Sequence, residues 1–187
     1  MTDIEANRAA ERAKYEWLLE HRPGYGSTNH GAKHLGRVLA SRPEFVVDLG
    51  CGDNAFARGI RLSGQARATG IDFANPGADI VAPMHRTTLG KHVADVVTAF
   101  DSLEHLLPEE VDDVLDEVAR IAKPDARLFF TIATRPSRIT AKGENLHPTV
   151  QPMGWWTDKV RRIAHGVTSH GSLVMGTVTG SQEEGHA

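Results

Sequence analysis

The sequence predicts an α/β fold in which helices and strands alternate around a doubly wound sheet. The first observation is a short apolar run from Phe45 to Asp48, followed by a Gly-x-Gly turn and a helix start. The second is a pair of further apolar runs, at 68–72 and 94–101, which both end in an aspartate. The third is a helical stripe of apolar residues between positions 108 and 122.

The segment ahead of the first strand, residues 1–42, is expected to form two helices and a loop. A polar, alanine-rich helix is predicted over residues 2–20, where apolar side chains are available for one face. A glycine-rich loop with several polar side chains follows at 22–31, and it leads to a second helix at 32–41.

The turn after the first strand has the features of a ligand-binding loop. Gly50 and Gly52 adopt positive φ at little cost and let the backbone approach a ligand closely. Asn54 also visits the left-handed region readily, and amides at the helix start favour a polar or anionic ligand group. Asp48 ends the strand ahead of the glycines, so its carboxylate would repel phosphate but suits an ammonium or a sulfonium.

Three more strands are expected before the central helix. The second strand covers 68–72, and its terminal Asp72 can accept hydrogen bonds from both ribose hydroxyls. The third strand is predicted at 79–84. The fourth spans 94–101 and runs into the stretch Ser102-Leu-Glu-His-Leu106.

The central helix, at 108–122, carries acids early and basic residues late, as the helix dipole favours. A short turn then leads to an apolar strand at 128–133.

The C-terminal part begins with a long connection over 135–154, and loops of this length in compact domains are usually functional or disordered. A helix is expected from Trp155 through His165, and a closing strand at 171–179. The polar tail from residue 180 is expected to be frayed.

Taken in this order, four matched elements between residues 45 and 135 resemble the core of class I S-adenosylmethionine-dependent methyltransferases. The matches are the glycine turn, the strand ending in Asp72, the strand that runs into Leu-Glu-His-Leu, and the helix with its following strand. The resemblance implies a mostly parallel sheet flanked by helices in three layers, with residues 43–135 as the cofactor-binding core. Asn54 stands where the family usually has a third glycine, and the acid that many relatives place near Pro83 is missing.

The resemblance implies S-adenosylmethionine as the cofactor, held by the strand ends and the turns. Asp48 is expected to bind the methionine part, Asp72 the ribose, and Met84 to pack on the adenine. The full set of expected cofactor contacts is Asp48, Gly50, Cys51, Gly52, Asn54, Asp72, Phe73, Met84, Asp101 and Leu103.

Methyl transfer requires a nucleophile held in line with the sulfur–carbon bond, and a hydroxyl or protonated amine also needs a base. Three histidines lie where a pocket is expected: His30, His105 and His147. The neighbouring carboxylate of Glu104 is expected to raise the basicity of His105. For each histidine a surface or hydrogen-bonding role without chemistry is the alternative.

Residues 136–187 are expected to supply the substrate loop and C-terminal elements. The loop from Arg135 to Gly154, together with residues 25–30, is expected to close over the cofactor and select the acceptor. Trp155 and Trp156 are expected to anchor it, one ring buried under the sheet and the other lining the pocket.

Length and composition favour one compact domain over residues 1–187, because this chain can bury a sizeable core. A hydrophobic fraction of 40% argues against disorder, and no run approaches the ~20 apolar residues that span a bilayer. The N-terminus lacks an apolar secretory core, and a lone Cys51 fits a reducing cytoplasm.

Several partners are disfavoured by the sequence. A net charge of −3 without a basic run makes nucleic acid an improbable partner, and the signatures of DNA base methylation are missing after the fourth strand. No His/Cys spacing suggests structural zinc, and the ligands of magnesium-dependent O-methyltransferases are not recognisable, so no metal is predicted. A small or medium-sized acceptor with an oxygen or nitrogen nucleophile is favoured; the oligomeric state is not indicated.

Two other function classes stay open. An NAD(P)-binding oxidoreductase would use the same turn, because Gly50, Gly52 and Ala55 fit the dinucleotide pattern, with Asp72 about 20 residues on. Asp48 directly before the glycines and the Leu-Glu-His-Leu turn argue against it. The other class is a catalytically silent partner subunit that binds S-adenosylmethionine and supports another enzyme.

Overall fold

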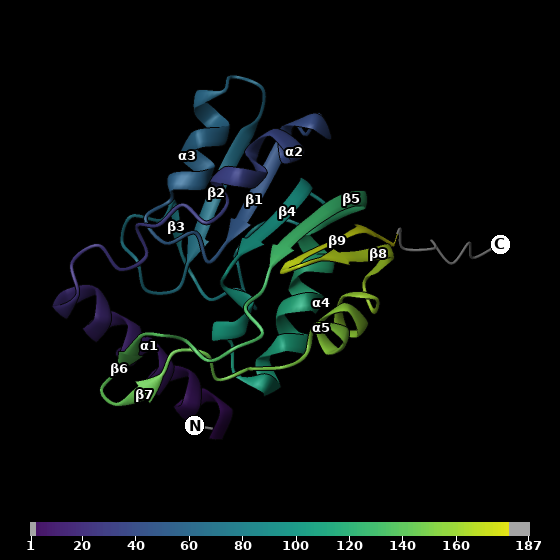
Figure 1. Ribbon diagram of the computed structural model, residues 1–187. Coiled ribbons are helices and arrows are strands. Elements are labelled where there is room, and N and C mark those ends of the chain that lie inside the picture. Colours follow the sequence, from purple (N-terminus) through teal and green to yellow (C-terminus); the bar gives the residue numbers. More distant parts are fainter. Residues whose placement is uncertain (1–2, 180–187) are drawn as a thin grey trace.

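A computed structural model describes residues 3–179, and it contains a seven-stranded sheet with the order β3-β2-β1-β4-β5-β9-β8 (Figure 1). The first five strands in this order pair in parallel, whereas β9 and β8 add an antiparallel edge. The fold class expected from the sequence, a mostly parallel α/β sheet, is therefore confirmed. The strands are β1 Phe45–Leu49, β2 Arg67–Asp72, β3 Ile80–Val81, β4 Ala94–Phe100, β5 Ala122–Thr131, β8 Ala164–His170 and β9 Leu173–Val178.

Helices cover both faces of this sheet, and they form the three layers that were expected (Figure 1). Strand β1 shows why: Val46 is buried in the cluster with Val38 and Phe56, while Val47 is buried in the cluster with Leu115 and Trp156. This alternation is the two-residue period of a strand that is buried on both faces. One face carries η1 Ala32–His34, α2 Leu35–Ala40 and α3 Ala55–Leu62, and the other carries η3 Pro108–Glu110, α4 Val111–Ile121 and α5 Met153–Val160.

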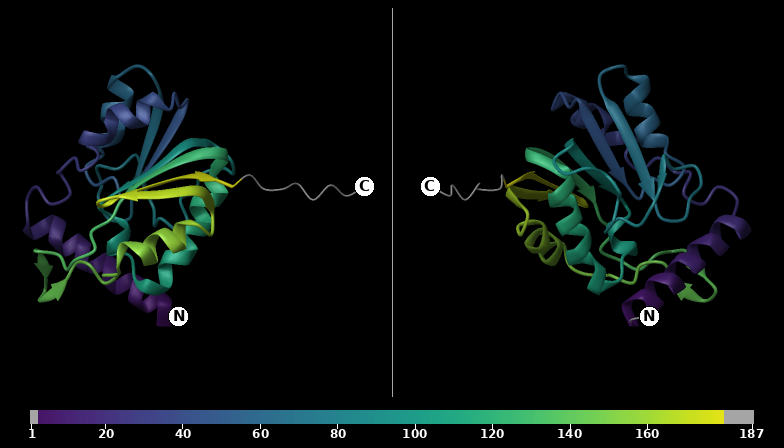
Figure 2. Two further views of the ribbon diagram at one scale, coloured as in Figure 1. Left: turned by 45° about the vertical axis from the view of Figure 1, so that its right-hand side comes forward. Right: turned by 180° about the vertical axis from the view of Figure 1, so that it is seen from behind.

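Helix α1, Asp3–His21, lies beyond the carboxyl ends of the parallel strands, as the two views of Figure 2 agree. It packs on a small hairpin inside the long connection, formed by β6 Thr140–Ala141 and β7 Glu144–Asn145. Tyr15 and Leu18 of α1 bury against Ala141 and Leu146 of that connection. Two segments far apart in the sequence therefore form one wall at the functional end of the sheet.

The register of the strands brings the predicted site residues together. Asp48 in β1 lies opposite Thr98 in β4 and Gly70 in β2. Since these strands run in parallel, their carboxyl ends lie side by side. The glycine turn, the end of β2 at Asp72 and the turn at Asp101 meet at this edge.

Some element boundaries differ from those expected. The helix expected through His165 ends at Val160, and His165 lies in β8, a strand that the sequence analysis missed. The side chains of β8 are mostly polar and exposed because it is an edge strand, so the alternating apolar signal is weak there. The expected third strand at 79–84 is shorter in the structure, where β3 covers only Ile80–Val81 at the other edge of the sheet.

None of the helices within residues 3–179 combines the length and the apolar character needed to cross a membrane. The polar tail from residue 180, expected to be frayed, lies outside the described residues.

Candidate active site

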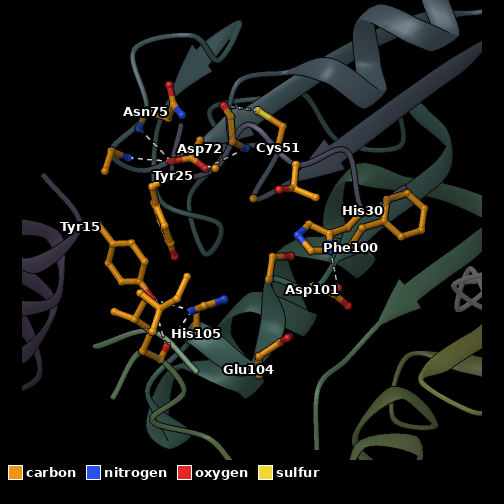
Figure 3. Close-up of a pocket in the computed structure, with 18 of the residues that line it drawn as sticks. Tyr15, Tyr25, His30, Cys51, Asp72, Asn75, Phe100, Asp101, Glu104 and His105 are labelled. Carbon is orange, nitrogen blue, oxygen red and sulfur yellow. Dashed lines mark hydrogen bonds and ion pairs between the residues drawn. The ribbon is translucent and has the colours of Figure 1, made fainter. Parts of the chain in front are cut away.

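A cavity of about 480 Å³ lies at the carboxyl ends of β1, β2 and β4, between the glycine turn, α1 and the long connection (Figure 3). It brings together the expected site residues from six separate segments. The residues named from the sequence that line it are His30, Asp48, Gly50, Cys51, Gly52, Asp72, Phe73, Met84, Asp101, His105 and His147.

Two residues expected to touch the cofactor are not among those that line the cavity. Asn54 adopts the left-handed conformation, with φ 69°, at the start of α3, and it is almost fully buried. Its side chain packs beneath the turn on Gly70, where a Cβ would lie only 2.1 Å from the Asn54 Oδ1 atom. Leu103 is buried in the core with α4. Both side chains support the turns from below.

The glycine turn has the positive φ angles that were expected, 68° at Gly50 and 56° at Gly52. The close neighbour of Gly52, however, is the protein itself. A Cβ on Gly52 would lie 2.2 Å from the carbonyl oxygen of Gly26, which accepts a hydrogen bond from the Asp53 N–H at 3.0 Å. Glycine at position 52 thus lets the 22–31 loop come down onto the turn.

Asp48 lies on the cavity wall with 3% of its surface exposed. Its Oδ1 atom accepts a hydrogen bond of 2.6 Å from the Thr98 hydroxyl, and burial raises the pKa of its carboxyl to about 7. Among the residues that the structure describes, no basic side chain forms an ion pair with Asp48. A buried carboxyl without a cationic partner favours a ligand that brings a positive charge.

The carboxylate of Asp72 organises two loops. Its Oδ1 atom accepts hydrogen bonds from the N–H groups of Ala74 (3.0 Å) and Asn75 (2.9 Å), and its Oδ2 atom accepts one from Gly52 (3.1 Å). Burial raises its pKa even though these three donors oppose the shift. A carboxylate has about four acceptor positions, so Asp72 keeps capacity for about one further donor rather than for both ribose hydroxyls.

Aromatic rings form the side of the cavity that α1 contributes. The ring centroid of Tyr15 lies 5.0 Å from that of Phe73 and 6.1 Å from that of Tyr25. Burial and the nearby charge of Asp72 raise the pKa of Tyr25 to about 12. Tyr25 belongs to the 25–30 loop that was expected to close over the cofactor, whereas Tyr15 was not expected at the site. The local signal for Tyr15 is only its place three positions before the buried Leu18 on one helix face.

His30 is paired with a carboxylate at the rim of the cavity. Its Nδ1 atom lies 2.8 Å from the Asp101 Oδ2 atom, and about half of the imidazole remains exposed (Figure 3). Asp101 has a φ of 50°, which is unusual for a residue other than glycine, and its N–H donates to the Thr131 carbonyl and hydroxyl oxygens. Strained residues of this kind concentrate at functional sites.

His105 behaves differently from the expectation. Burial lowers the pKa of its imidazole to about 4, so the expected increase in basicity is wrong. The physical reason is that Glu104 is itself fully buried, and burial raises the pKa of its carboxyl to about 8. Glu104 is then largely uncharged near neutral pH and supplies little charge to its neighbour.

The long connection contributes His147 and forms the outer wall of the cavity. The His147 ring lies edge-on to that of His105, with centroids 4.7 Å apart. Thr149 fastens this part of the loop, because its hydroxyl donates to the Leu106 carbonyl at 2.6 Å and its N–H donates to that of Glu104 at 3.3 Å. The loop residues that line the cavity are Arg135, Ser137, Arg138, Ile139, Leu146 and His147.

Of the two tryptophans, one is buried as expected, but the other does not line the cavity. Trp156 is buried in the main core, but Trp155 is not among the residues that line the cavity. The ring of Trp155 lies instead beneath the Lys159 ammonium, 5.1 Å from the ring centroid. Helix α5 starts at Met153, two residues earlier than expected, and this places Trp155 on the outer side of the core.

Cys51 lines the cavity as a half-buried free thiol, and the pKa of this thiol is raised by desolvation and by nearby acids, chiefly Asp48. A thiol with a raised pKa is a poor nucleophile. Its small side chain suits a crowded turn, in agreement with the sequence.

Three side chains with metal-binding atoms also meet at the cavity. The atoms offered by Glu104, His105 and His147 all lie within 4.8 Å of one another. No metal site was expected from the sequence. Glu104 and His105 are adjacent in the chain, but His147 comes close to them only when the chain folds.

Comparisons with known proteins identify the family of the chain. Residues 29–171 match the family described as "Methyltransferase domain". No curated protein sequence is significantly similar to the chain. The family match over residues 29–171 covers the glycine turn, the acids at the strand ends and the long connection.

Solved structures are similar in fold at low sequence identity, and this likeness concerns the fold alone. A 1,6-didemethyltoxoflavin-N1-methyltransferase from Burkholderia thailandensis, solved with 1,6-didemethyltoxoflavin and S-adenosylhomocysteine, has a TM-score of 0.75 and 13% identity over 96% of this chain and 92% of that one. An O-methyltransferase family protein from the same organism has a TM-score of 0.65 and 18% identity over 94% and 68% of the two chains. A phosphoethanolamine N-methyltransferase from Haemonchus contortus, solved with S-adenosyl-L-methionine, has a TM-score of 0.58 and 11% identity over 85% and 42%.

Proposed function

Because the chain belongs to the class I family of S-adenosylmethionine-dependent methyltransferases, we propose that it methylates a small or medium-sized acceptor at an oxygen or nitrogen atom. The observation that carries this proposal is the buried Asp48 carboxyl beside the glycine turn, in a cavity whose opposite wall is polar. S-adenosylmethionine supplies a methyl group already activated on a positively charged sulfur.

The residues of the inner wall fit this cofactor. Asp48 would hold the amino group of the methionine part, since it is a buried carboxyl that lacks a cationic partner within residues 3–179. Asp72 would accept a ribose hydroxyl with its remaining capacity. Phe73 and Met84 also line the cavity and would supply apolar surface for the adenine.

The outer wall suits a compact acceptor with polar groups. The cavity of about 480 Å³ falls in the range of small-molecule sites, roughly 300–1,000 Å³. It must hold cofactor and acceptor together, which limits the size of the acceptor. Arg135, Arg138 and His147 from the long connection, with His30 from the 22–31 loop, would bind and orient it.

The pair of His30 and Asp101 is the arrangement that best serves proton removal. The Asp101 carboxylate orients the imidazole through Nδ1, which leaves Nε2 to accept the acceptor's proton. The side chains of both loops would hold the nucleophile in line with the methyl group, and such positioning accounts for much of catalysis in this kind of transfer.

We also propose the compartment and organisation expected from the sequence. A single cysteine, present as a free thiol, supports a cytoplasmic enzyme. Residues 43–135 would bind the cofactor, while residues 1–42 and 136–187 would select the acceptor. The cavity between these parts supports that division.

The test is transfer of an isotope-labelled methyl group from S-adenosylmethionine to a pool of metabolites by the purified chain, followed by mass spectrometry. We expect labelled products that depend on His30. Cofactor binding without any labelled product would favour the silent partner subunit. Preferential binding of a nicotinamide dinucleotide would favour the oxidoreductase.

A further inference from the structure

Glu104 has a buried oxygen without a partner. The residue is 0% exposed, and its Oε1 atom accepts a hydrogen bond of 3.1 Å from the Ala133 N–H. No hydrogen-bond donor within residues 3–179 reaches the Oε2 atom. An unsatisfied buried carboxyl oxygen is costly, and in a native protein it calls for an explanation such as a bound ion.

The ring of His105 is held in one tautomer. Its Nδ1 atom lies 2.7 Å from the Leu146 carbonyl oxygen and 2.6 Å from the Tyr15 hydroxyl. A carbonyl oxygen only accepts, so the contact with Leu146 is a hydrogen bond in the tautomer that carries the proton on Nδ1, and in that tautomer the Tyr15 hydroxyl donates to the same carbonyl at 3.1 Å. The lone pair of His105 is therefore on Nε2, which is directed away from Tyr15 toward the cavity (Figure 3).

His147 is held in the same way. Its Nδ1 atom lies 2.7 Å from the Arg135 carbonyl oxygen, which again requires the proton on Nδ1 and leaves the lone pair on Nε2. Histidines that bind metals almost always donate their other ring N–H to a carbonyl, a carboxylate or water. Both histidines thus make the carbonyl contact through Nδ1 that orients the ring of a metal-binding histidine.

These three side chains face one another across a short gap. Their ligand atoms lie within 4.8 Å of one another, and the two imidazoles are nearly perpendicular, at 89°. Ligand atoms bound to one ion at roughly 2.0–2.2 Å are about 3–4 Å apart, so small side-chain rotations would complete the geometry. The loop is already fastened to this turn by Thr149.

We propose that Glu104, His105 and His147 form a binding site for a divalent transition-metal ion at the acceptor end of the cavity. Two imidazoles and one carboxylate suit Zn²⁺, Mn²⁺, Fe²⁺ or Co²⁺ better than Ca²⁺, which prefers oxygen ligands. Three protein ligands leave an open position, as in catalytic rather than structural metal sites.

The surrounding charges are compatible with a cation. Asp101 adds negative charge close to Glu104, whereas Arg135 and Lys14 add positive charge close to Glu104 and His105. Lys14 is already paired with Glu11 at 2.7 Å, and Arg135 donates to its neighbouring Pro136 carbonyl at 3.4 Å.

The open position would take a hydroxyl oxygen of the acceptor, a step that rests on the proposed methyl transfer. Coordination to a divalent ion lowers the pKa of a hydroxyl. The hydroxyl proton would pass to the His30 Nε2 atom. An oxygen–carbon bond then forms to the methyl group while the carbon–sulfur bond breaks and leaves its electron pair on sulfur. The site therefore favours an oxygen nucleophile over nitrogen.

Metal binding can be tested without cofactor or acceptor. The full chain is stripped with a chelator and titrated with Co²⁺ and Zn²⁺, followed by visible absorption and by equilibrium dialysis with metal analysis. We expect about one ion per chain and the intense absorption of a Co²⁺ ion with a low coordination number. Glu104→Gln and His147→Ala should each weaken binding at least about tenfold.

A matched control separates this site from surface binding. His165→Ala and His170→Ala change exposed histidines of β8, outside the cavity, and should leave the affinity unchanged. Thermal unfolding of each variant shows that it is folded. Equal binding by wild type and by the Glu104→Gln/His147→Ala double variant would overturn the metal site and leave the methyl-transfer proposal intact. A chain that binds the ion at this site but transfers no methyl group would support the metal site and overturn the methyl-transfer proposal.

Discussion

The Gly26 carbonyl oxygen occupies the space that a side chain on Gly52 would need, 2.2 Å from the position of its Cβ. The loop over residues 22–31 can close on the glycine turn only because position 52 has no side chain. Glycine is therefore required at this turn by the protein's own backbone, in addition to its φ of 56°.

Substitution of Gly52 should open this loop and abolish cofactor binding. In Gly52→Val the side chain meets the Gly26 backbone and opposes positive φ, so we expect no measurable S-adenosylmethionine binding by calorimetry. Gly64→Ala is the matched control, because Gly64 has a φ of 69° with no atom within 4 Å of an added Cβ. It should lose about 1–2 kcal/mol of stability from strain and retain affinity. Unchanged affinity in a folded Gly52→Val chain would contradict the assignment.

Asp48 should make stability depend on pH in a characteristic direction. Burial raises the pKa of its carboxyl from 3.8 to about 7, so between about pH 4 and 7 the folded state keeps a proton that the unfolded state has released. The free energy of unfolding should fall as pH rises through this window. Asp48→Asn should remove this part of the dependence, as measured by urea unfolding at pH 5 and pH 8. An identical pH dependence in both chains would rule out this role.

Asp72→Ala should weaken cofactor binding by about 1.5–3 kcal/mol through the loss of charge-assisted hydrogen bonds. The same change also removes the acceptor for the N–H groups of Gly52, Ala74 and Asn75. Thermal unfolding must therefore accompany the calorimetry. An affinity within a factor of two of wild type would make Asp72 a bystander.

The pair of His30 and Asp101 should control turnover and leave cofactor affinity nearly unchanged. His30→Ala is expected to lower kcat by about 10²–10⁴, the usual contribution of a general base. Asp101→Asn keeps a residue that tolerates a φ of 50° but removes the charge, so its effect on kcat should be smaller and in the same direction. Steady-state kinetics with the labelled methyl donor measures both, and full activity in His30→Ala would exclude this residue as the base.

Short sequence patterns made the parallel sheet predictable, together with the wall of the cavity that the strand ends and the glycine turn form. The apolar run of β1, the glycines after it and the acids that end β2 and β4 are written in short stretches of sequence. Because parallel strands place their carboxyl ends at one edge, Asp48 and Asp72 could be expected on one ligand. Strand β8 escaped prediction because an exposed edge strand needs no apolar alternation.

The contacts and the burial of the residues at the outer wall of the cavity depend on the tertiary structure alone. The sequence by itself shows only that Tyr15, His105 and His147 lie in three separate polar or amphipathic segments. Folding places the Tyr15 hydroxyl 2.6 Å from the His105 Nδ1 atom and brings the two imidazoles into an edge-to-face contact. Burial then lowers the pKa of His105 and raises that of Glu104, in opposition to the effect expected from their adjacency in the chain. The reason is physical: hydrophobic period and backbone preference act over a few residues, whereas desolvation and hydrogen-bond partners depend on whichever distant segments pack together.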